Sequence, residues 1–124
     1  MDTTKCIELP GKNVTLYVLK ASTHFIALFV SMKTKGHHNC SISMDYEKAG
    51  KLDVFIDDRK RMRIPFVPFK APFRPIKHDG NIFRVTREHG NILFTLSEKG
   101  RGDLCVTVQD QRQIRKLRNY LKKR

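Results

Sequence analysis

The segment between residues 59 and 77 combines arginine, lysine and phenylalanine, three side chains that together can hold a single-stranded nucleic acid. It contains seven Lys or Arg, no acidic residue and three Pro-Phe pairs. Arginine pairs bidentately with phosphate and stacks on flat rings, and an aromatic ring stacks on an unpaired base for about 1–3 kcal/mol. We therefore predict nucleic-acid contacts from this basic Pro-Phe segment. The cationic contacts are Arg59, Lys60, Arg61, Arg63, Lys70, Arg74 and Lys77, and the aromatic contacts are Phe66, Phe69 and Phe73.

A second interpretation of the same segment is a crossover loop. Proline fixes φ and removes a backbone donor, so the segment is neither a helix nor a central strand. The spacing of three between Pro65 and Pro68 fits a polyproline II turn, in which Phe66 and Phe69 share a side. Exposed phenylalanine is costly, and the rings could instead cover the edge of the core. In that case only the basic residues would remain on the surface.

Residues 110–124 predict a basic helix that begins at about Asp110, an acceptable N-cap. Ile114, Leu117 and Leu121 recur at helical spacing and mark the buried side, with Tyr120 beside them. Cations at the C-terminal end suit the helix dipole. Arg112 and Arg115 instead lie near the N-terminal end, without acidic partners four residues away. We therefore predict phosphate contacts from Arg112, Arg115, Lys116, Arg118, Lys122 and Lys123.

The positive charge of the chain is confined to its second half. The 124 residues carry 25 Lys and Arg against 12 Asp and Glu, a net charge of +13. Lysines and acids balance over residues 1–58, so the whole excess lies in residues 59–124, which also hold every arginine. A strongly positive surface attracts polyanions, and Arg84 and Arg87 add to it. The charge indicates an anionic polymer or an anionic surface as the partner.

Alternating apolar residues predict a β-rich chain. Strands fit the runs 13–21, 25–32, 40–46, 81–87, 91–97 and 104–108. Residues 45–58 fit two patterns, a short helix capped by Asp45 or a hairpin whose second strand covers 52–56. Gly50 and the β-branched residues favour the hairpin. We therefore predict one α+β domain over residues 1–124, with about seven to eight antiparallel strands and the basic amphipathic C-terminal helix.

Two short segments about 65 residues apart are similar: Cys-Ser-Ile-Ser-Met-Asp at 40–45 and Cys-Val-Thr-Val-Gln-Asp at 105–110. Each precedes a candidate helix, which suggests a duplicated unit of three strands followed by a helix. At the level of fold, such a duplication resembles the Whirly and Pur-type proteins, which bind single strands. The resemblance is one of fold and assigns no family. We predict RNA or single-stranded DNA as the partner rather than duplex DNA, because no recognition-helix motif is evident and a surface of strands and aromatic rings suits unstacked bases.

Two further classes of function fit the sequence. If residues 45–58 form a hairpin, seven strands and a C-terminal helix resemble the pleckstrin-homology architecture, whose basic loop would meet the headgroups of an anionic membrane. Alternatively, a viral or other structural protein could use the basic half to contact genome or acidic partners. Exposed strand edges in the neutral first half would allow a homodimer or a higher oligomer.

No catalytic pattern stands out, so we expect no enzyme activity, no cofactor and no metal. His37, His38 and Cys40 are too few for a zinc site unless distant cysteines join them. The K-x-D-G pattern at 77–80 matches nucleotidyl-transfer enzymes, which need a much larger domain, and a turn at Asp-Gly is the simpler interpretation. No apolar run reaches the about 20 residues of a membrane span, and three widely spaced cysteines suit free thiols. We therefore expect an intracellular protein of the nucleus or cytoplasm.

Overall fold

A computed structural model describes residues 6–31, 38–57, 73–88, 90–100 and 102–122, which form two four-stranded antiparallel sheets and two helices. The first sheet has β1 (Cys6–Pro10), β2 (Val14–Lys20), β3 (His24–Ser31) and β4 (His38–Asp45), followed by α1 (Tyr46–Phe55). The second sheet has β5 (Ile76–His78), β6 (Asn81–Glu88), β7 (Asn91–Glu98) and β8 (Gly102–Val108), followed by α3 (Gln111–Lys122). The predicted β-rich α+β class with a C-terminal helix is confirmed, and each sheet has four strands rather than three.

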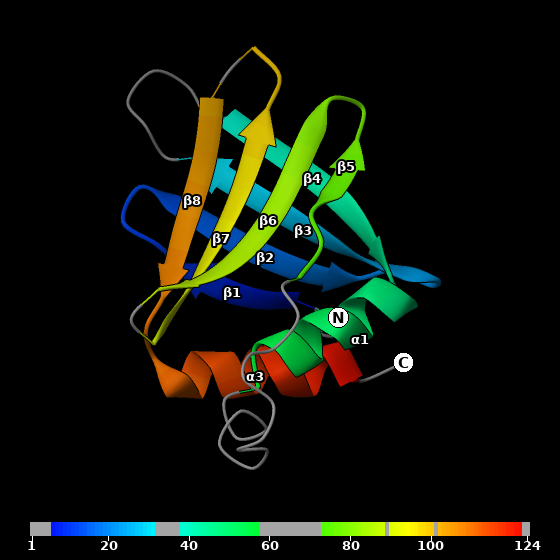
Figure 1. Cartoon of the computed structure of the whole chain (residues 1–124), viewed down its shortest axis with the longest axis vertical. Helices are drawn as coiled ribbons and strands as arrows, with labels where there is room; N and C mark the ends of the chain where they lie inside the picture. The colour runs from blue at the N-terminus through cyan, green and yellow to red at the C-terminus, as the bar shows by residue number, and fades with distance from the viewer. Residues whose placement is uncertain (1–5, 32–37, 58–72, 89, 101, 123–124) are drawn as a thin grey trace.

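The core lies between the two sheets. The alternation that predicted the strands places every second residue inside, as with Val14, Leu16 and Val18 of β2. Strands of the second sheet pass across those of the first (Figure 1). Phe29 and Phe83 meet between them, with ring centroids 6.0 Å apart. Side chains of both sheets therefore share one core.

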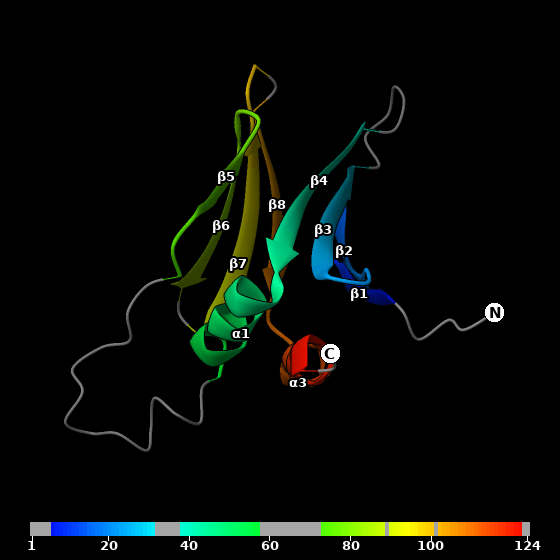
Figure 2. The same ribbon diagram turned by 90° about the vertical axis from the view of Figure 1, so that its right-hand side faces the viewer.

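Both helices lie at the same end of the two sheets (Figure 2). α3 buries Ile114, Leu117 and Leu121, the three residues predicted for its inner side, and it also buries Tyr120. The Tyr120 ring lies 5.7 Å from Phe25 of β3, which also receives Tyr46 of α1 at 5.5 Å. Burial raises the pKa of Tyr120, and a hydrogen bond with the backbone of Lys20 in β2 partly opposes that rise. These contacts hold α3 in a fixed orientation on the first sheet.

The favoured hairpin within residues 45–58 is wrong, because residues 46–55 form α1. The carboxylate of Asp45 accepts a hydrogen bond from the Lys48 amide at 2.8 Å, as an N-cap does. Ala49, Leu52 and the following Ile56 are all buried, at helical spacing. Val54, whose branching favoured a strand, is 44% exposed. Burial of one face thus outweighs a local preference worth under about 1 kcal/mol per residue.

The two similar segments occupy equivalent places, because each runs from the last strand of a sheet to the N-cap of a helix. Asp110 precedes α3 as Asp45 precedes α1, and its carboxylate accepts from the Arg112 amide at 2.9 Å. The inward phase differs, however, since Cys40 is buried and Cys105 is exposed. The similarity of the two segments therefore reflects a common helix N-cap and not a common pattern of buried side chains.

Two short strands were not predicted, β1 and β5. Each is adjacent to a proline, Pro10 at the end of β1 and Pro75 just before β5, and both are the first strands of their sheets. Proline is tolerated at such edges because one row of amides needs no ladder partner. The expected Asp-Gly turn is confirmed between β5 and β6, where Asp79 and Gly80 both have positive φ, 51° and 83°.

Candidate nucleic-acid interface

The predicted contact residues divide between described and undescribed parts of the chain. Those outside the described residues are Arg59, Lys60, Arg61, Arg63, Phe66, Phe69, Lys70 and Lys123. Those that the structure places are Phe73, Arg74, Lys77, Arg84, Arg87, Arg112, Arg115, Lys116, Arg118 and Lys122. The placed residues fall into three groups, namely an exposed row on α3, an exposed group on the second sheet, and side chains directed into the protein.

α3 presents its cations to solvent on the side opposite its buried residues. Arg112, Arg115, Lys116 and Lys122 are exposed. α3 contains no acidic residue, and in the ranges that the structure describes none of these four side chains forms an ion pair. Arg112 lies in the first turn, where a cation opposes the helix dipole. Capping and dipole effects therefore account for Lys122 but not for Arg112.

The second sheet carries three exposed cations near or on its outer face. Arg74 precedes β5, and Lys77 and Arg84 lie on β5 and β6. The register aligns Arg84 with Thr95 and Cys105, and Lys77 with Ile82, Ser97 and Asp103. Partners in a ladder share a face, so this face is polar with scattered apolar residues. Its charge is more mixed than that of α3.

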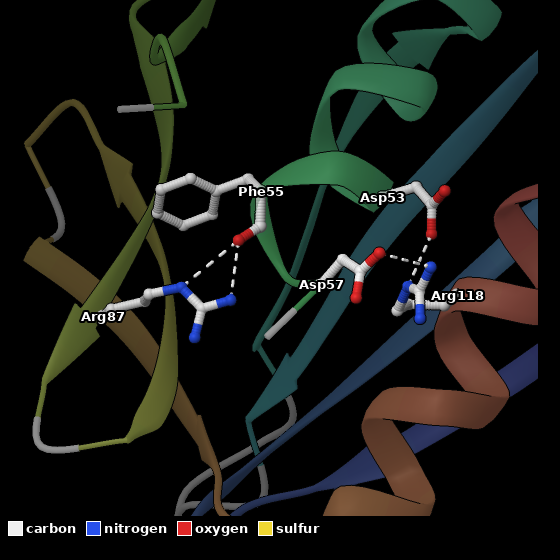
Figure 3. Close-up of polar contacts among 5 residues, drawn as sticks. All are labelled: Asp53, Phe55, Asp57, Arg87 and Arg118. Atoms are coloured by element: carbon white, nitrogen blue, oxygen red, sulfur yellow. Dashed lines mark hydrogen bonds and ion pairs between the residues drawn. The ribbon is translucent and has the colours of Figure 1, made fainter. Parts of the chain in front are cut away.

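Arg118 points into the protein and joins α3 to α1 (Figure 3). Its Nε lies 2.9 Å from Oδ1 of Asp53, and its Nη2 lies 3.0 Å from Oδ2 of Asp57. The side chains of Arg118, Asp53 and Asp57 are only 11%, 14% and 3% exposed. The planar guanidinium can serve two carboxylates at once, which a lysine cannot do with the same geometry. Arg118 therefore has a structural role in joining the helices.

Arg87 contacts the other side of the α1 C-terminus (Figure 3). Its Nε and Nη2 donate to the Phe55 carbonyl oxygen at 3.2 and 2.7 Å, and its guanidinium carbon lies 5.5 Å from the centroid of the Phe55 ring. A cation at the last carbonyls of a helix satisfies free acceptors and favours the dipole. Two arginines of the second half thus hold the end of α1.

Phe73 belongs to the core. It is 8% exposed, and its ring centroid lies 6.4 Å from that of Phe55 and 6.3 Å from that of Phe83. At this one position the crossover-loop interpretation of the Pro-Phe segment describes the structure. A buried ring is not available for stacking on a base.

The acceptors of Arg118 were not predicted from the sequence. Asp53 lies in the last turn of α1, and Asp57 follows its C-cap, Ile56. A spacing of four also places two residues on one face of a strand, so the spacing alone does not distinguish the helix from the predicted hairpin. No such signal exists for Arg87, since its acceptor is a backbone carbonyl.

The placed residues offer no assembled chemical site beyond these contacts. Within the part of the chain that the structure describes, no three His, Cys, Asp or Glu side chains gather as metal ligands. No described helix is long and apolar enough to cross a membrane. Burial, with the charge of Glu8 nearby, raises the pKa of the Cys6 thiol, which makes it a poorer nucleophile.

A scan against protein-family models finds no match, and no curated protein matches the sequence.

Proposed function

We propose that this protein is a non-catalytic nucleic-acid-binding protein that prefers RNA or single-stranded DNA. The observation that carries the proposal is the outer side of α3, where Arg112, Arg115, Lys116 and Lys122 are exposed and, among the described residues, unpaired. Phosphate oxygens are the natural acceptors for such a row.

The burial of Arg118 strengthens this interpretation of the exposed cations. Asp53 and Asp57 lie beside α3, and both are engaged by Arg118. They are therefore directed away from the exposed row and offset its charge only weakly. A helix surface that keeps its positive charge attracts a polyanion and speeds its encounter.

A single strand fits the exposed elements better than a duplex. α3 buries four residues along its length against the protein. It therefore packs on the sheets and does not project from them as a recognition helix that enters the major groove. The outer face of the second sheet, with Arg84 and Lys77, is an open surface of the kind on which unstacked bases lie. The contacts predicted from residues 59–70 and from Lys123 lie outside the described residues and stay predictions.

Fluorescence anisotropy tests the proposal with labelled single-stranded RNA, single-stranded DNA and duplex DNA over a salt series. We expect submicromolar binding of a single strand by the full chain. The variant Arg112→Ala/Arg115→Ala/Lys116→Ala should bind more weakly, and the slope of log K against log salt should fall by about 0.7 per lost phosphate contact. A second variant, Arg59→Ala/Arg61→Ala/Arg63→Ala/Arg74→Ala, tests the basic Pro-Phe segment.

The matched control is Lys12→Ala/Lys48→Ala/Lys51→Ala, which removes three positive charges from the first half of the chain. It should leave affinity nearly unchanged. Equal weakening in the control and the α3 variant, or equal weak binding of all three nucleic acids, would mean that the charge binds polyanions without a site.

Binding to anionic liposomes tests the alternative that the protein binds a membrane surface. The pleckstrin-homology likeness depended on a hairpin within residues 45–58, and that segment is α1. Flotation of the protein with phosphoinositide vesicles, undiminished by excess RNA, would favour the membrane over the nucleic acid.

A further inference from the structure

β4 is the outermost strand at one end of the first sheet, in the order β1-β2-β3-β4 of the described strands. It is eight residues long and has no charged residue or proline from Asn39 to Met44. An edge strand presents a row of backbone N–H and C=O groups that can pair with another chain.

The other three edges of the described sheets have features that oppose pairing with another chain. β1 has five residues and ends at Pro10. β5 has only three residues. β8 begins with Gly102 and Asp103 and packs against β1 and β2. Short length, proline, charge and coverage are the usual means by which an edge avoids pairing.

The sequence of β4 is compatible with pairing to itself in the antiparallel direction. A two-fold axis perpendicular to the sheet keeps inner residues opposite inner residues. With the axis at Ile42, the two Ile42 side chains face each other and Ser41 faces Ser43 of the second copy. With the axis at Ser41, the two Ser41 side chains face each other. Neither register brings like charges together, which would oppose pairing.

We propose that the edge of β4 is a self-association surface, on which a second copy of this chain adds its own β4. The two first sheets then form one continuous eight-stranded sheet. The hydroxyl-bearing outer side of β4, Ser41 and Ser43, is exposed in each copy and leaves room for a cross-strand neighbour. Such a particle carries two basic surfaces, but the proposal does not depend on what those surfaces bind.

Sedimentation equilibrium of the full chain, without nucleic acid and over a concentration series, tests this surface. The wild type should follow a monomer–dimer equilibrium. In Ser41→Lys/Ser43→Lys, lysines of the two copies face each other in either register. Because like charges directly opposite are destabilising, we expect the dissociation constant to rise about tenfold or more. Both positions are exposed, so the monomer should keep its far-ultraviolet circular dichroism.

The matched control is Thr86→Lys/Thr107→Lys, which adds the same charge at exposed positions on the outer face of the second sheet. It should self-associate like the wild type. Amide hydrogen exchange gives a second readout, because alternate amides of β4 should gain protection as concentration rises. A wild type that stays monomeric, a dimer weakened equally by both variants, or β4 protection independent of concentration would each overturn the proposal.

Discussion

Arg118 and Arg115 are three residues apart on α3 and have opposite surroundings. Arg115 is exposed, whereas Arg118 is 11% exposed and held by two carboxylates. A buried charge is tolerated only when it is paired and hydrogen-bonded. The pairing of Arg118 with Asp53 and Asp57 therefore agrees with the inward side set by the four buried residues of α3. It also removes Arg118 from the cations of α3 that a partner can reach.

Arg118→Ala should destabilise the protein strongly. The substitution removes the cation from two largely buried carboxylates, and breaking a buried ion pair in this way costs about 3–5 kcal/mol. Urea denaturation followed by circular dichroism measures the loss. Arg115→Ala should change the free energy of unfolding by no more than about 0.5 kcal/mol.

Arg118→Met combined with Asp53→Asn and Asp57→Asn separates charge from packing. It should recover much of the stability, because no uncompensated charge stays inside. Losses of similar size for Arg118→Ala and Arg115→Ala would show that the ion pair does not hold the helices.

At the scale of elements, the patterns that could be predicted were the local ones. The ends of the six predicted strands lie within two residues of the observed ends. The alternation of inward and outward side chains in a strand is a local pattern that the sequence shows directly. α1 could not be predicted in the same way. Gly50 and Val54 disfavour a helix locally, and the burial of Ala49, Leu52 and Ile56 under the sheets outweighs them. The Arg118 pairing could not be predicted either, because Asp53 and Asp57 come close enough to share one guanidinium only when the chain coils at the end of α1.

The N-cap of α1 should contribute measurably to the free energy of unfolding, because residues 46–55 have only a weak helical preference of their own. Asp45→Ala removes the acceptor of the Lys48 amide, and we expect a loss of about 1 kcal/mol in the free energy of unfolding. Hydrogen exchange at the Lys48 amide should accelerate. Asp45→Asn keeps a capping oxygen and should lose much less. If Ala and Asn behave alike, the start of α1 is set by packing alone.

At the scale of the molecule, the two sheets share one hydrophobic core. Phe83 of the second sheet contacts Phe29 of the first at 6.0 Å and Phe73 at 6.3 Å. The Asn81 amide nitrogen also lies 3.6 Å from the Cys40 sulfur, across the two sheets. The alternation of each strand predicted which residues turn inward, but the facing of the two sheets is a non-local property that no window of sequence contains. Elements with one core are expected to unfold together.

Phe83→Ala therefore should destabilise both sheets, although the residue belongs to the second. Phe83 is 1% exposed, and removing a buried phenylalanine costs about 3–5 kcal/mol. Cys40 is buried in β4, so the reactivity of its thiol reports unfolding of the first sheet. Pulsed thiol labelling in urea, read by mass spectrometry, should show Cys40 becoming reactive at the same lowered midpoint as the loss of circular dichroism. Thr86→Ala, at an exposed position in the same strand, should leave that midpoint nearly unchanged. If Cys40 stays protected while the second sheet unfolds, the two sheets unfold independently. The aromatic contacts between them would then contribute little to the stability of the first sheet.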